Sequence, residues 1–281
     1  MDDLITSAEA AELAGVGPSA IKRWADADLI RCRVTPGGHR RFKRIDVERF
    51  VRQSTREQSK SAWDDWIHDL VHDGRTHAVQ ARLHGDRARL GAWHLAAAEL
   101  GDLLCELGDR WAAGQLTVVQ EHVASAGLQR ALAAVADAIP VGPDAPRCLL
   151  ACAEGDEHTL GLSLVELCLR EAGWQTEWAG SRTRPADIIE RVKGGTLRMV
   201  GVSASAQSSD AEALEAQART LAAVCAMNDV TLVLGGSGAW PADPAGAVRF
   251  SEFPAFYEFA IAGRGAVAKP APGRLRSRDT R

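Results

Sequence analysis

The stretch Cys148-Leu-Leu-Ala-Cys-Ala-Glu-Gly-Asp-Glu-His-Thr-Leu-Gly161 decides the fold of the carboxyl-terminal half of the chain. It begins as an apolar run, typical of a buried strand, and ends in a D-x-H-x-x-G element formed by Asp156, His158 and Gly161. A histidine that follows a strand lies at the carboxyl edge of a sheet, and an aspartate two residues earlier can accept its Nδ1 proton. Because Nε2 then stays free, His158 is a candidate metal ligand.

Two later apolar runs end in small residues. Residues 199–202 are followed by Ser203-Ala204-Ser205, and residues 231–234 by Gly235-Gly236. Hydroxyl groups can bond a buried base, and glycines leave room for a bulky group between helix and sheet edge. Taken singly, each element fits an ordinary helix cap or βα turn equally well.

In this order and at this spacing, the three elements resemble the cobalamin-binding Rossmann-like domain of methionine synthases, B12-dependent mutases and B12-dependent regulators. The resemblance implies that His158 is the lower cobalt ligand and that Asp156 sets its tautomer. The other residues that it implies in cofactor binding, from the same loops, are Glu157, Gly161, Ser203, Ser205, Gly235 and Gly236.

Composition favours a soluble, cytoplasmic, multidomain protein. The 281 residues are 46% hydrophobic and 25% charged, with a net charge of −4, and we expect no membrane span and no signal segment. The six cysteines show no C-x-x-C pair, which favours buried thiols over disulfides or a zinc site. Residues 20–60 carry twelve Lys and Arg against five acids, which predicts a nucleic-acid contact, although a solvated charged face would have the same composition.

The first 52 residues predict a winged helix-turn-helix. Thr6-Ser7-Ala8-Glu9 is a capping-box pattern that begins a first helix, and Pro18-Ser19 begin a second that carries Ile21, Trp24 and Leu29. Residues 31–42 place Pro-Gly-Gly between two Arg-rich extended arms, which predicts a wing. The segment resembles the MerR-type DNA-binding domain. That resemblance implies contacts with double-stranded operator DNA from Lys22, Arg23, His39, Arg40 and Arg41.

The middle of the chain predicts a linker and a helical bundle. Residues 53–61 are polar without an apolar period, and residues 62–140 have a helical period that predicts about four helices. On one continuous helix, Trp111, Val118 and His122 would share a face, although Gly114 interrupts the pattern. These residues are equally compatible with an ordinary core.

The Trp111 to Glu121-His122 spacing resembles the bundle of CarH/LitR-type B12-dependent photoreceptor regulators. In that family this element lies over the upper face of adenosylcobalamin, which implies that role for Trp111, Val118, Glu121 and His122. A histidine that can follow the tryptophan in that family and capture cobalt after photolysis is replaced here by Ala112. The sequence therefore leaves open whether a bis-histidine light state forms.

The predicted fold is an α+β multidomain chain. A winged helix-turn-helix (1–52) is followed by a linker (53–61), a four-helix bundle (62–140), a Rossmann-like α/β domain with a parallel sheet (146–262) and a disordered basic tail (263–281). Within the Rossmann-like domain we expect strands near 148–153, 175–178, 199–202 and 231–234, and helices near 159–172, 185–193 and 210–227.

The resemblance implies a regulator rather than an enzyme. The expected function is a light-responsive repressor that binds DNA as an adenosylcobalamin-stabilised dimer or tetramer and is released by photolysis. Two alternatives stay open: a light-independent MerR-type regulator that senses methylcobalamin, hydroxocobalamin or another tetrapyrrole, and a subunit of a cobalamin-dependent methyltransferase. The methyltransferase would need a substrate barrel or a partner module.

Overall fold

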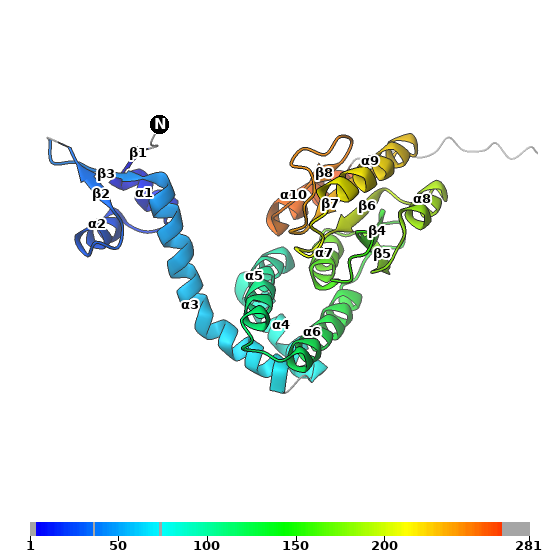
Figure 1. Ribbon diagram of the computed structural model, residues 1–281, viewed down its shortest axis with the longest axis horizontal. Coiled ribbons are helices and arrows are strands. Elements are labelled where there is room, and N and C mark those ends of the chain that lie inside the picture. The colour runs from blue at the N-terminus through cyan, green and yellow to red at the C-terminus, as the bar shows by residue number, and fades with distance from the viewer. Residues whose placement is uncertain (1–3, 36, 73–74, 266–281) are drawn as a thin grey trace, which may run out of the picture. The chain divides into compact units, whose positions relative to one another are not determined.

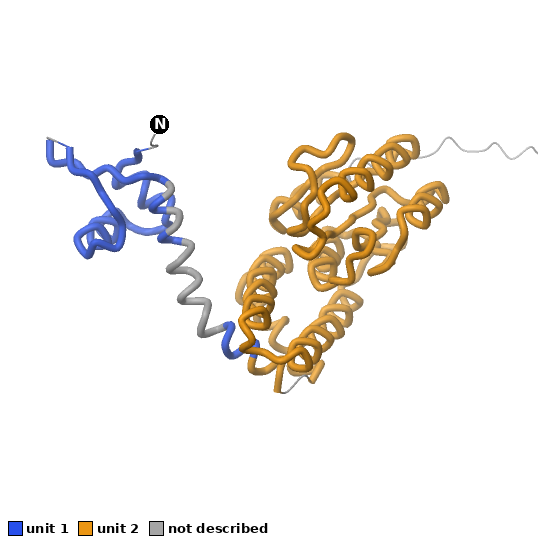
Figure 2. Tube along the Cα trace, in the orientation of Figure 1, with its two compact units in different colours: residues 1–67 blue, residues 68–281 orange. Residues whose placement is uncertain are grey.

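The computed structural model describes residues 4–35, 37–72 and 75–265 (Figure 1). The chain divides into two compact units, residues 1–67 and residues 68–281 (Figure 2). Within the described ranges, no helix combines the length and the apolar composition that crossing a bilayer requires.

The first unit combines short helices with a three-stranded sheet. Its elements in order are β1 (Leu4–Thr6), α1 (Ser7–Leu13), α2 (Pro18–Asp26), β2 (Cys32–Val34), β3 (Arg40–Lys43) and the first part of α3 (Arg44–His72). Strand β3 is central and pairs antiparallel with β1 and β2, so β2 and β3 form the expected wing. Strand β1 was not predicted from the sequence.

Local sequence explains the helix boundaries in this unit. Thr6 Oγ1 accepts the Glu9 amide at 3.2 Å and the Glu9 carboxylate accepts the Thr6 amide at 2.7 Å, which is the predicted capping box. Buried Ile21 and Phe42 join the helices to the wing in one core. Leu29 is a correction to the sequence analysis, because α2 ends at Asp26 and the Leu29 side chain is 56% exposed.

Helix α3 corrects the expectation of an irregular linker at residues 53–61. The helix runs without a break from Arg44 to His72 and includes that segment. The segment contains neither glycine nor proline, and Gln, Arg, Glu and Lys have high helix propensity, so the backbone stays helical without an apolar face.

The second unit begins with the predicted helical bundle. After the end of α3, its helices are α4 (Thr76–Leu90), α5 (Trp93–Ala112) and α6 (Val118–Ala138). Alanine and leucine line their buried faces; examples are Leu83, Leu103 and Leu128. Gly91, at φ +87°, ends α4 in the left-handed conformation that glycine adopts without strain.

A Rossmann-like domain completes the second unit. Its elements are β4 (Arg147–Cys152), α7 (Leu160–Glu171), β5 (Gln175–Gly180), α8 (Pro185–Lys193), β6 (Met199–Ser203), α9 (Ala211–Met227), β7 (Thr231–Gly235), β8 (Val248–Arg249) and α10 (Phe253–Gly265). The strands are parallel in the order β5-β4-β6-β7-β8. The predicted strands and helices of this domain are confirmed, whereas β8 and α10 were not predicted.

Helices cover both faces of the sheet (Figure 1). Helices α8 and α9 pack together on one face, over a core that includes Leu149, Val200 and Leu221. Helix α7 packs against α5, α6 and α10, so the bundle is joined to the sheet domain through α7. The predicted tail at 263–281 begins inside α10, and its residues 266–281 lie outside the described part of the chain.

Candidate functional site

The candidate site lies at the carboxyl edge of the parallel sheet. Strand β4 pairs with β5 on one side and β6 on the other, so the chain reverses its winding direction between β4 and β6. Ligands of open α/β sheets bind at such a switch point. The loop that carries His158 follows β4, and Ser203-Ala204-Ser205 follow β6, so the two predicted elements meet there.

Asp156 is the buried centre of this loop, and its side chain is 0% exposed. One carboxylate oxygen accepts the His158 amide at 2.9 Å and lies 3.0 Å from His158 Nδ1. The other accepts the Ser205 amide at 2.6 Å and the Ser208 hydroxyl at 2.7 Å. Ser208 was missed in the sequence analysis, because it is distant from Asp156 along the chain.

These hydrogen bonds keep Asp156 ionised. Burial acts to raise the pKa of Asp156, but the bonds from the His158 and Ser205 amides and from the Ser208 hydroxyl outweigh it and lower the pKa to about 2. An ionised carboxylate can only accept, so His158 Nδ1 donates its proton to Asp156, and in the neutral imidazole Nε2 then carries a lone pair. The His158 side chain is 61% exposed, which leaves this lone pair open to a ligand.

The neighbouring thiol does not compete with the imidazole. Burial, helped by the negative charge of Asp156, raises the pKa of Cys152 to about 12, so the thiol stays protonated. The Cys152 sulfur lies 3.6 Å from the His158 carbonyl oxygen, to which it can donate.

The two predicted serines have different surroundings. The Ser205 hydroxyl lies 3.1 Å from His158 Nδ1, so Ser205 contacts both members of the Asp156-His158 pair. Ser203 lies further back, where its hydroxyl is 3.9 Å from the position that a side chain on Gly161 would occupy. Both serines thus adjoin the expected site, Ser205 beside the Asp156-His158 pair and Ser203 beside Gly161.

Backbone packing explains why one residue of the Gly235-Gly236 pair must be a glycine. Gly236 has φ +85°, and a Cβ built on it would lie 2.2 Å from the Ala204 carbonyl oxygen, so no other residue fits there. A Cβ on Gly235 would meet only the Phe250 carbonyl, at an ordinary 3.7 Å. Gly238, which the sequence analysis did not single out, would also clash, at 2.5 Å from the Ala204 side chain.

Glu157 faces another loop. Arg182 in the loop after β5 lies 2.6 Å from the Glu157 carboxylate, and both side chains are more than half exposed. The ion pair ties the His158 loop to the β5–α8 connection.

The predicted upper-face residues do not share one helix. Trp111 lies in the last turn of α5, whereas Val118, Glu121 and His122 lie at the start of α6, after a turn in which Gly114 has φ +71°. The expectation of one continuous helical face is therefore wrong. Thr117 caps α6 through Gln120, and together with Gly114 this pattern in the sequence marks the break.

These residues are unusually exposed for apolar and aromatic side chains. Trp111 is 44% exposed, Val118 53%, and the His122 side chain 72%. The Glu121 carboxylate accepts the Ser125 hydroxyl at 2.5 Å and lies 3.6 Å from His122 Nε2. An exposed indole beside exposed valines favours a binding surface over an ordinary core.

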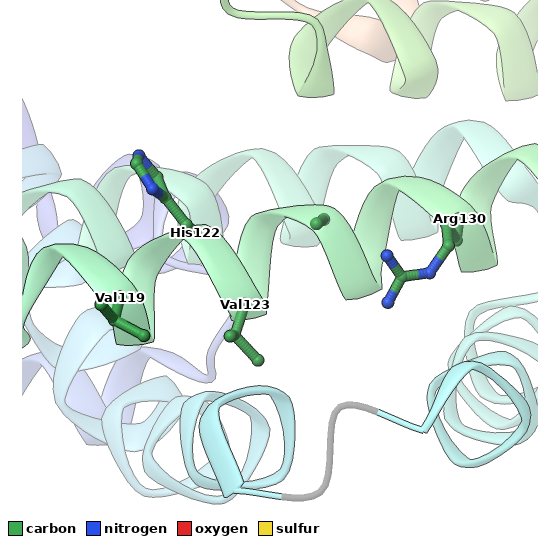
Figure 3. Close-up of a pocket in the computed structure, with 5 residues that line it drawn as sticks. Val119, His122, Val123 and Arg130 are labelled. Carbon is green, nitrogen blue, oxygen red and sulfur yellow. The ribbon is translucent and has the colours of Figure 1, made fainter.

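A shallow pocket adjoins this surface on α6. Its volume is about 300 Å³, and it is lined by Val119, His122, Val123, Ala126 and Arg130. In the view of Figure 3, Val119 and Val123 project from one side of α6 and His122 from the other. His122 therefore stands at the edge of the pocket, between the valine stripe and the face of α6 that carries Val118.

The DNA-contacting residues predicted in the first unit fall into two groups. Lys22, Arg23 and His39 are exposed on α2 and on the wing. Arg40 is held inside the unit: it donates to the Lys22 carbonyl at 2.8 Å and to the Asp26 carboxylate at 2.5 Å. Its partner Asp26 raises the pKa of Arg40, and the bonds fasten the wing to α2. Arg41 is half-buried beside it and donates to the Arg40 carbonyl at 3.1 Å.

Comparison with known proteins agrees with these three parts. Residues 4–55 match a helix-turn-helix domain family, and residues 68–136 and 146–248 match two families that are both described as a B12 binding domain. Over 141 residues the chain is 35% identical to the HTH-type transcriptional repressor CarA of Myxococcus xanthus, and over 110 residues it is 36% identical to the repressor CarH of the same organism.

Over the aligned residues the chain is similar to the CarA and CarH repressors. The resemblance inferred from the sequence is thereby confirmed, and the B12-binding matches support a cobalamin cofactor. The alignments span 49% and 39% of this chain, and 45% and 36% of the two relatives, so the chain spans less than half the length of the repressors it matches.

A solved structure supports the fold of the second unit. The monomethylamine corrinoid protein of Methanosarcina barkeri superposes with a TM-score of 0.53 over 73% of this chain and 99% of its own, at 14% identity. At that identity the similarity concerns the arrangement of helices and strands alone.

Proposed function

We propose that this chain is a cobalamin-dependent, light-responsive transcriptional repressor, which binds operator DNA as an adenosylcobalamin-stabilised dimer or tetramer and leaves it on illumination. The observation that carries the proposal is the exposed His158 imidazole, whose Nδ1 lies against a buried, ionised Asp156. The relatives CarA and CarH, which are described as transcriptional repressors, supply the regulatory part of the proposal.

The residues fit a corrin-bound cobalt. Among residues 4–35, 37–72 and 75–265, no three His, Cys, Asp or Glu side chains gather as a metal cluster. A cobalt ion already held by a corrin ring would need few protein ligands, and His158 would offer it one imidazole nitrogen, with the orientation of the ring fixed by the Asp156 carboxylate. Adenosylcobalamin, when bound, would supply a cobalt–carbon bond that visible light breaks.

In this proposal the helical bundle covers the bound cofactor. Trp111 and Val118 offer apolar surface, and His122 with Glu121 offers polar groups at the start of α6. Because these side chains are exposed, their burial by a ligand would gain about 25 cal/mol for each Å² of apolar surface removed from water. We therefore propose that this surface determines which form of cobalamin the chain binds.

The regulatory step requires differential affinity. A ligand shifts an equilibrium only when it binds one state more tightly, so the assembled state must hold the cover closed over His158 better than the free subunit does. Several linked winged helices bind repeated DNA elements with high avidity, and loss of assembly lowers that avidity without changing a single wing residue.

Ala112 bears on the state after photolysis. A methyl side chain after Trp111 cannot ligate a metal, so no histidine at this position can capture cobalt. The alternative to the light switch is a light-independent regulator that responds to methylcobalamin or hydroxocobalamin.

The test combines spectroscopy, mass and DNA binding. The purified chain is mixed in darkness with adenosylcobalamin, methylcobalamin or hydroxocobalamin; its absorption, its molar mass and its affinity for a selected DNA duplex are measured, then measured again after green light. We expect uptake of adenosylcobalamin, a larger assembly that binds DNA, and loss of both on illumination. Uptake without any effect of light would favour the alternative, and no uptake of any cobalamin would overturn the proposal.

The matched variants are His158→Ala and His77→Ala. Both side chains are exposed, but His77 lies on α4, where its Nδ1 is 3.4 Å from Gln80 Oε1. We expect His158→Ala to lose the cobalt-ligand absorption signature and His77→Ala to keep it. Retention of the wild-type spectrum by His158→Ala would contradict the assigned ligand.

A further inference from the structure

A side-chain hydrogen bond links the bundle to the loop that carries the proposed ligand. Gln129 Nε2 on α6 donates to Thr159 Oγ1 at 2.8 Å. Thr159 follows His158 directly and is the residue before the first turn of α7. The bond therefore joins α6 to the residue next to the proposed ligand His158.

Thr159 is available for this contact because it does not cap its own helix. Its side chain makes no capping bond to α7, although threonine at this position commonly does. Its carbonyl oxygen instead accepts the Ser163 amide at 3.0 Å and the Ser163 hydroxyl at 3.3 Å. The Thr159 hydroxyl, which makes no bond to its own helix, accepts a bond from Gln129 on the bundle.

Gln129 lies on the same face of α6 as His122. The two are seven residues apart, which on an α-helix is a rotation of about 20° and a rise of about 10 Å. Val118 and Ser125 belong to this face as well, whereas the pocket residues Val119, Val123 and Arg130 lie about 100° around the helix. One face of α6 thus reaches the His158 loop with one end and the proposed cover with the other.

We propose that Gln129 is a positioning residue that holds the His158 loop at a fixed register against α6, and so fixes the space between the lower ligand and the cover. The inference rests on the proposed function and adds to it a residue that contacts neither DNA nor, in its assigned role, the cobalt. Helix α6 packs along α7, so the hydrogen bond is formed on an already assembled interface and needs little ordering.

The experiment removes each partner with a side chain of similar size. Gln129→Met keeps the length and loses the donor, and Thr159→Val keeps the shape and loses the hydroxyl. Thr159→Ser restores the hydroxyl, and Gln80→Met is the control on another bundle helix. Two quantities are measured: amide hydrogen exchange of residues 154–160 without cobalamin, and the dissociation rate of adenosylcobalamin in darkness together with its absorption spectrum.

We expect Gln129→Met and Thr159→Val each to speed exchange in residues 154–160 by about fivefold, the value for one net hydrogen bond. The double variant should add little to either single variant, because both remove the same bond. Dissociation of cobalamin should quicken by a similar factor, and Thr159→Ser and Gln80→Met should match the wild type in both measurements.

Failure of this inference is distinguishable from failure of the proposed function. Unchanged exchange in Gln129→Met would overturn the positioning role, even in a protein that binds cobalamin through His158. Faster exchange with an unchanged dissociation rate and spectrum would also overturn it, because the bond would then be structural only. If no variant, wild type included, takes up cobalamin, the proposed function fails, and the positioning role toward the cofactor fails with it.

Discussion

Asp156 fixes the orientation of His158 through two separate bonds, one to the backbone amide at 2.9 Å and one to Nδ1 at 3.0 Å. The same carboxylate binds the loop after β6 through Ser205 and Ser208. One buried charge thus sets the tautomer of the imidazole and joins the ends of two neighbouring strands. Ligand geometry and loop structure therefore depend on the same group.

Replacing Asp156 with Asn should lower both the stability of the folded chain and its affinity for cobalamin. Four donors would face an amide, which is neutral and offers only one acceptor oxygen, and we expect a loss of about 1–3 kcal/mol in the free energy of unfolding. Cobalamin affinity should fall about 10- to 100-fold, as for other partners of metal-bound histidines. Urea unfolding and a dark cobalamin titration measure the two effects. Asp243→Asn, at an exposed position, is the matched control; equal effects of the two variants would contradict the assignment.

The same carboxylate predicts an acid limb in the stability profile. The pKa of Asp156 is lowered in the folded protein to about 2 from an ordinary 3.8. A lowered pKa contributes stability that is complete above the unfolded value and is lost as the pH falls through the folded value, so the loss occurs between about pH 4 and pH 2. Unfolding free energies across this range should fall more steeply for the wild type than for Asp156→Asn. Parallel curves would show that other carboxylates govern acid unfolding.

The two adjacent glycines predict opposite outcomes. Gly236→Ala would place a methyl group 2.2 Å from the Ala204 carbonyl oxygen, so the loops that carry these two residues would have to separate. The φ of +85° at this position would also strain an alanine. We expect a loss of more than about 2 kcal/mol in stability and, with it, of cobalamin uptake. Gly235→Ala has an ordinary contact at 3.7 Å and should stay folded. Thermal unfolding compares the two; similar melting temperatures would refute the clash at Gly236.

Residue patterns that are local in the chain predicted most of this fold. The apolar runs that became β4, β6 and β7, and the Thr6 capping box, are readable because one short segment decides each. The two residues of β8 are too few for a periodicity, and they form a strand because they pair with Val233 and Leu234. Helix α10 has its aromatic residues without a clear helical stripe, since it packs on both α5 and α7.

For the site, the sequence predicted the residue types better than their arrangement. The loop histidine, its aspartate and Ser205 lie together as expected. Trp111 and His122 were placed on one helix because the apolar spacing continues across Gly114, whereas a left-handed glycine and a new helix cap separate them. The contacts of Ser208 and of Gln129 join elements distant in the chain, and no local pattern announces them.

Glu171 forms a second contact between the helical bundle and the sheet domain. Helix α5 begins at Trp93 without a side-chain cap of its own, and the Glu171 carboxylate on α7 accepts the Trp93 amide at 2.7 Å and the His94 amide at 3.0 Å. It also lies 2.8 Å from His94 Nδ1. Glu171→Ala should cost about 2 kcal/mol, since it removes a helix cap and leaves nearly buried donors unpaired.

Glu99→Ala is the control for Glu171. Glu99 is paired with Arg89 at 2.5 Å, but its side chain is 51% exposed against 12% for Glu171. Exposed pairs of this kind contribute at most about 1 kcal/mol. Urea unfolding should therefore separate the two variants, and faster amide exchange at the start of α5 should appear only in Glu171→Ala. Equal losses would mean that Glu171 does not act as the cap of α5.

Replacing Asp26 should show whether this residue affects DNA affinity by fixing the wing or by its negative charge. Asp26 accepts a hydrogen bond from Arg40, which also donates to the Lys22 carbonyl on α2, the helix proposed to contact DNA. Removing an acid near DNA should strengthen binding if charge alone matters. If instead Asp26 fixes the wing, Asp26→Asn should weaken binding about fivefold, which corresponds to about 1 kcal/mol.

Asp28→Asn is the matched control: the residue is exposed, and its φ of +57° suits asparagine. Affinities for a selected duplex over a salt series should therefore fall for Asp26→Asn and rise slightly for Asp28→Asn, whereas a rise for both would show that the charge of Asp26, and not its bond to Arg40, affects DNA binding.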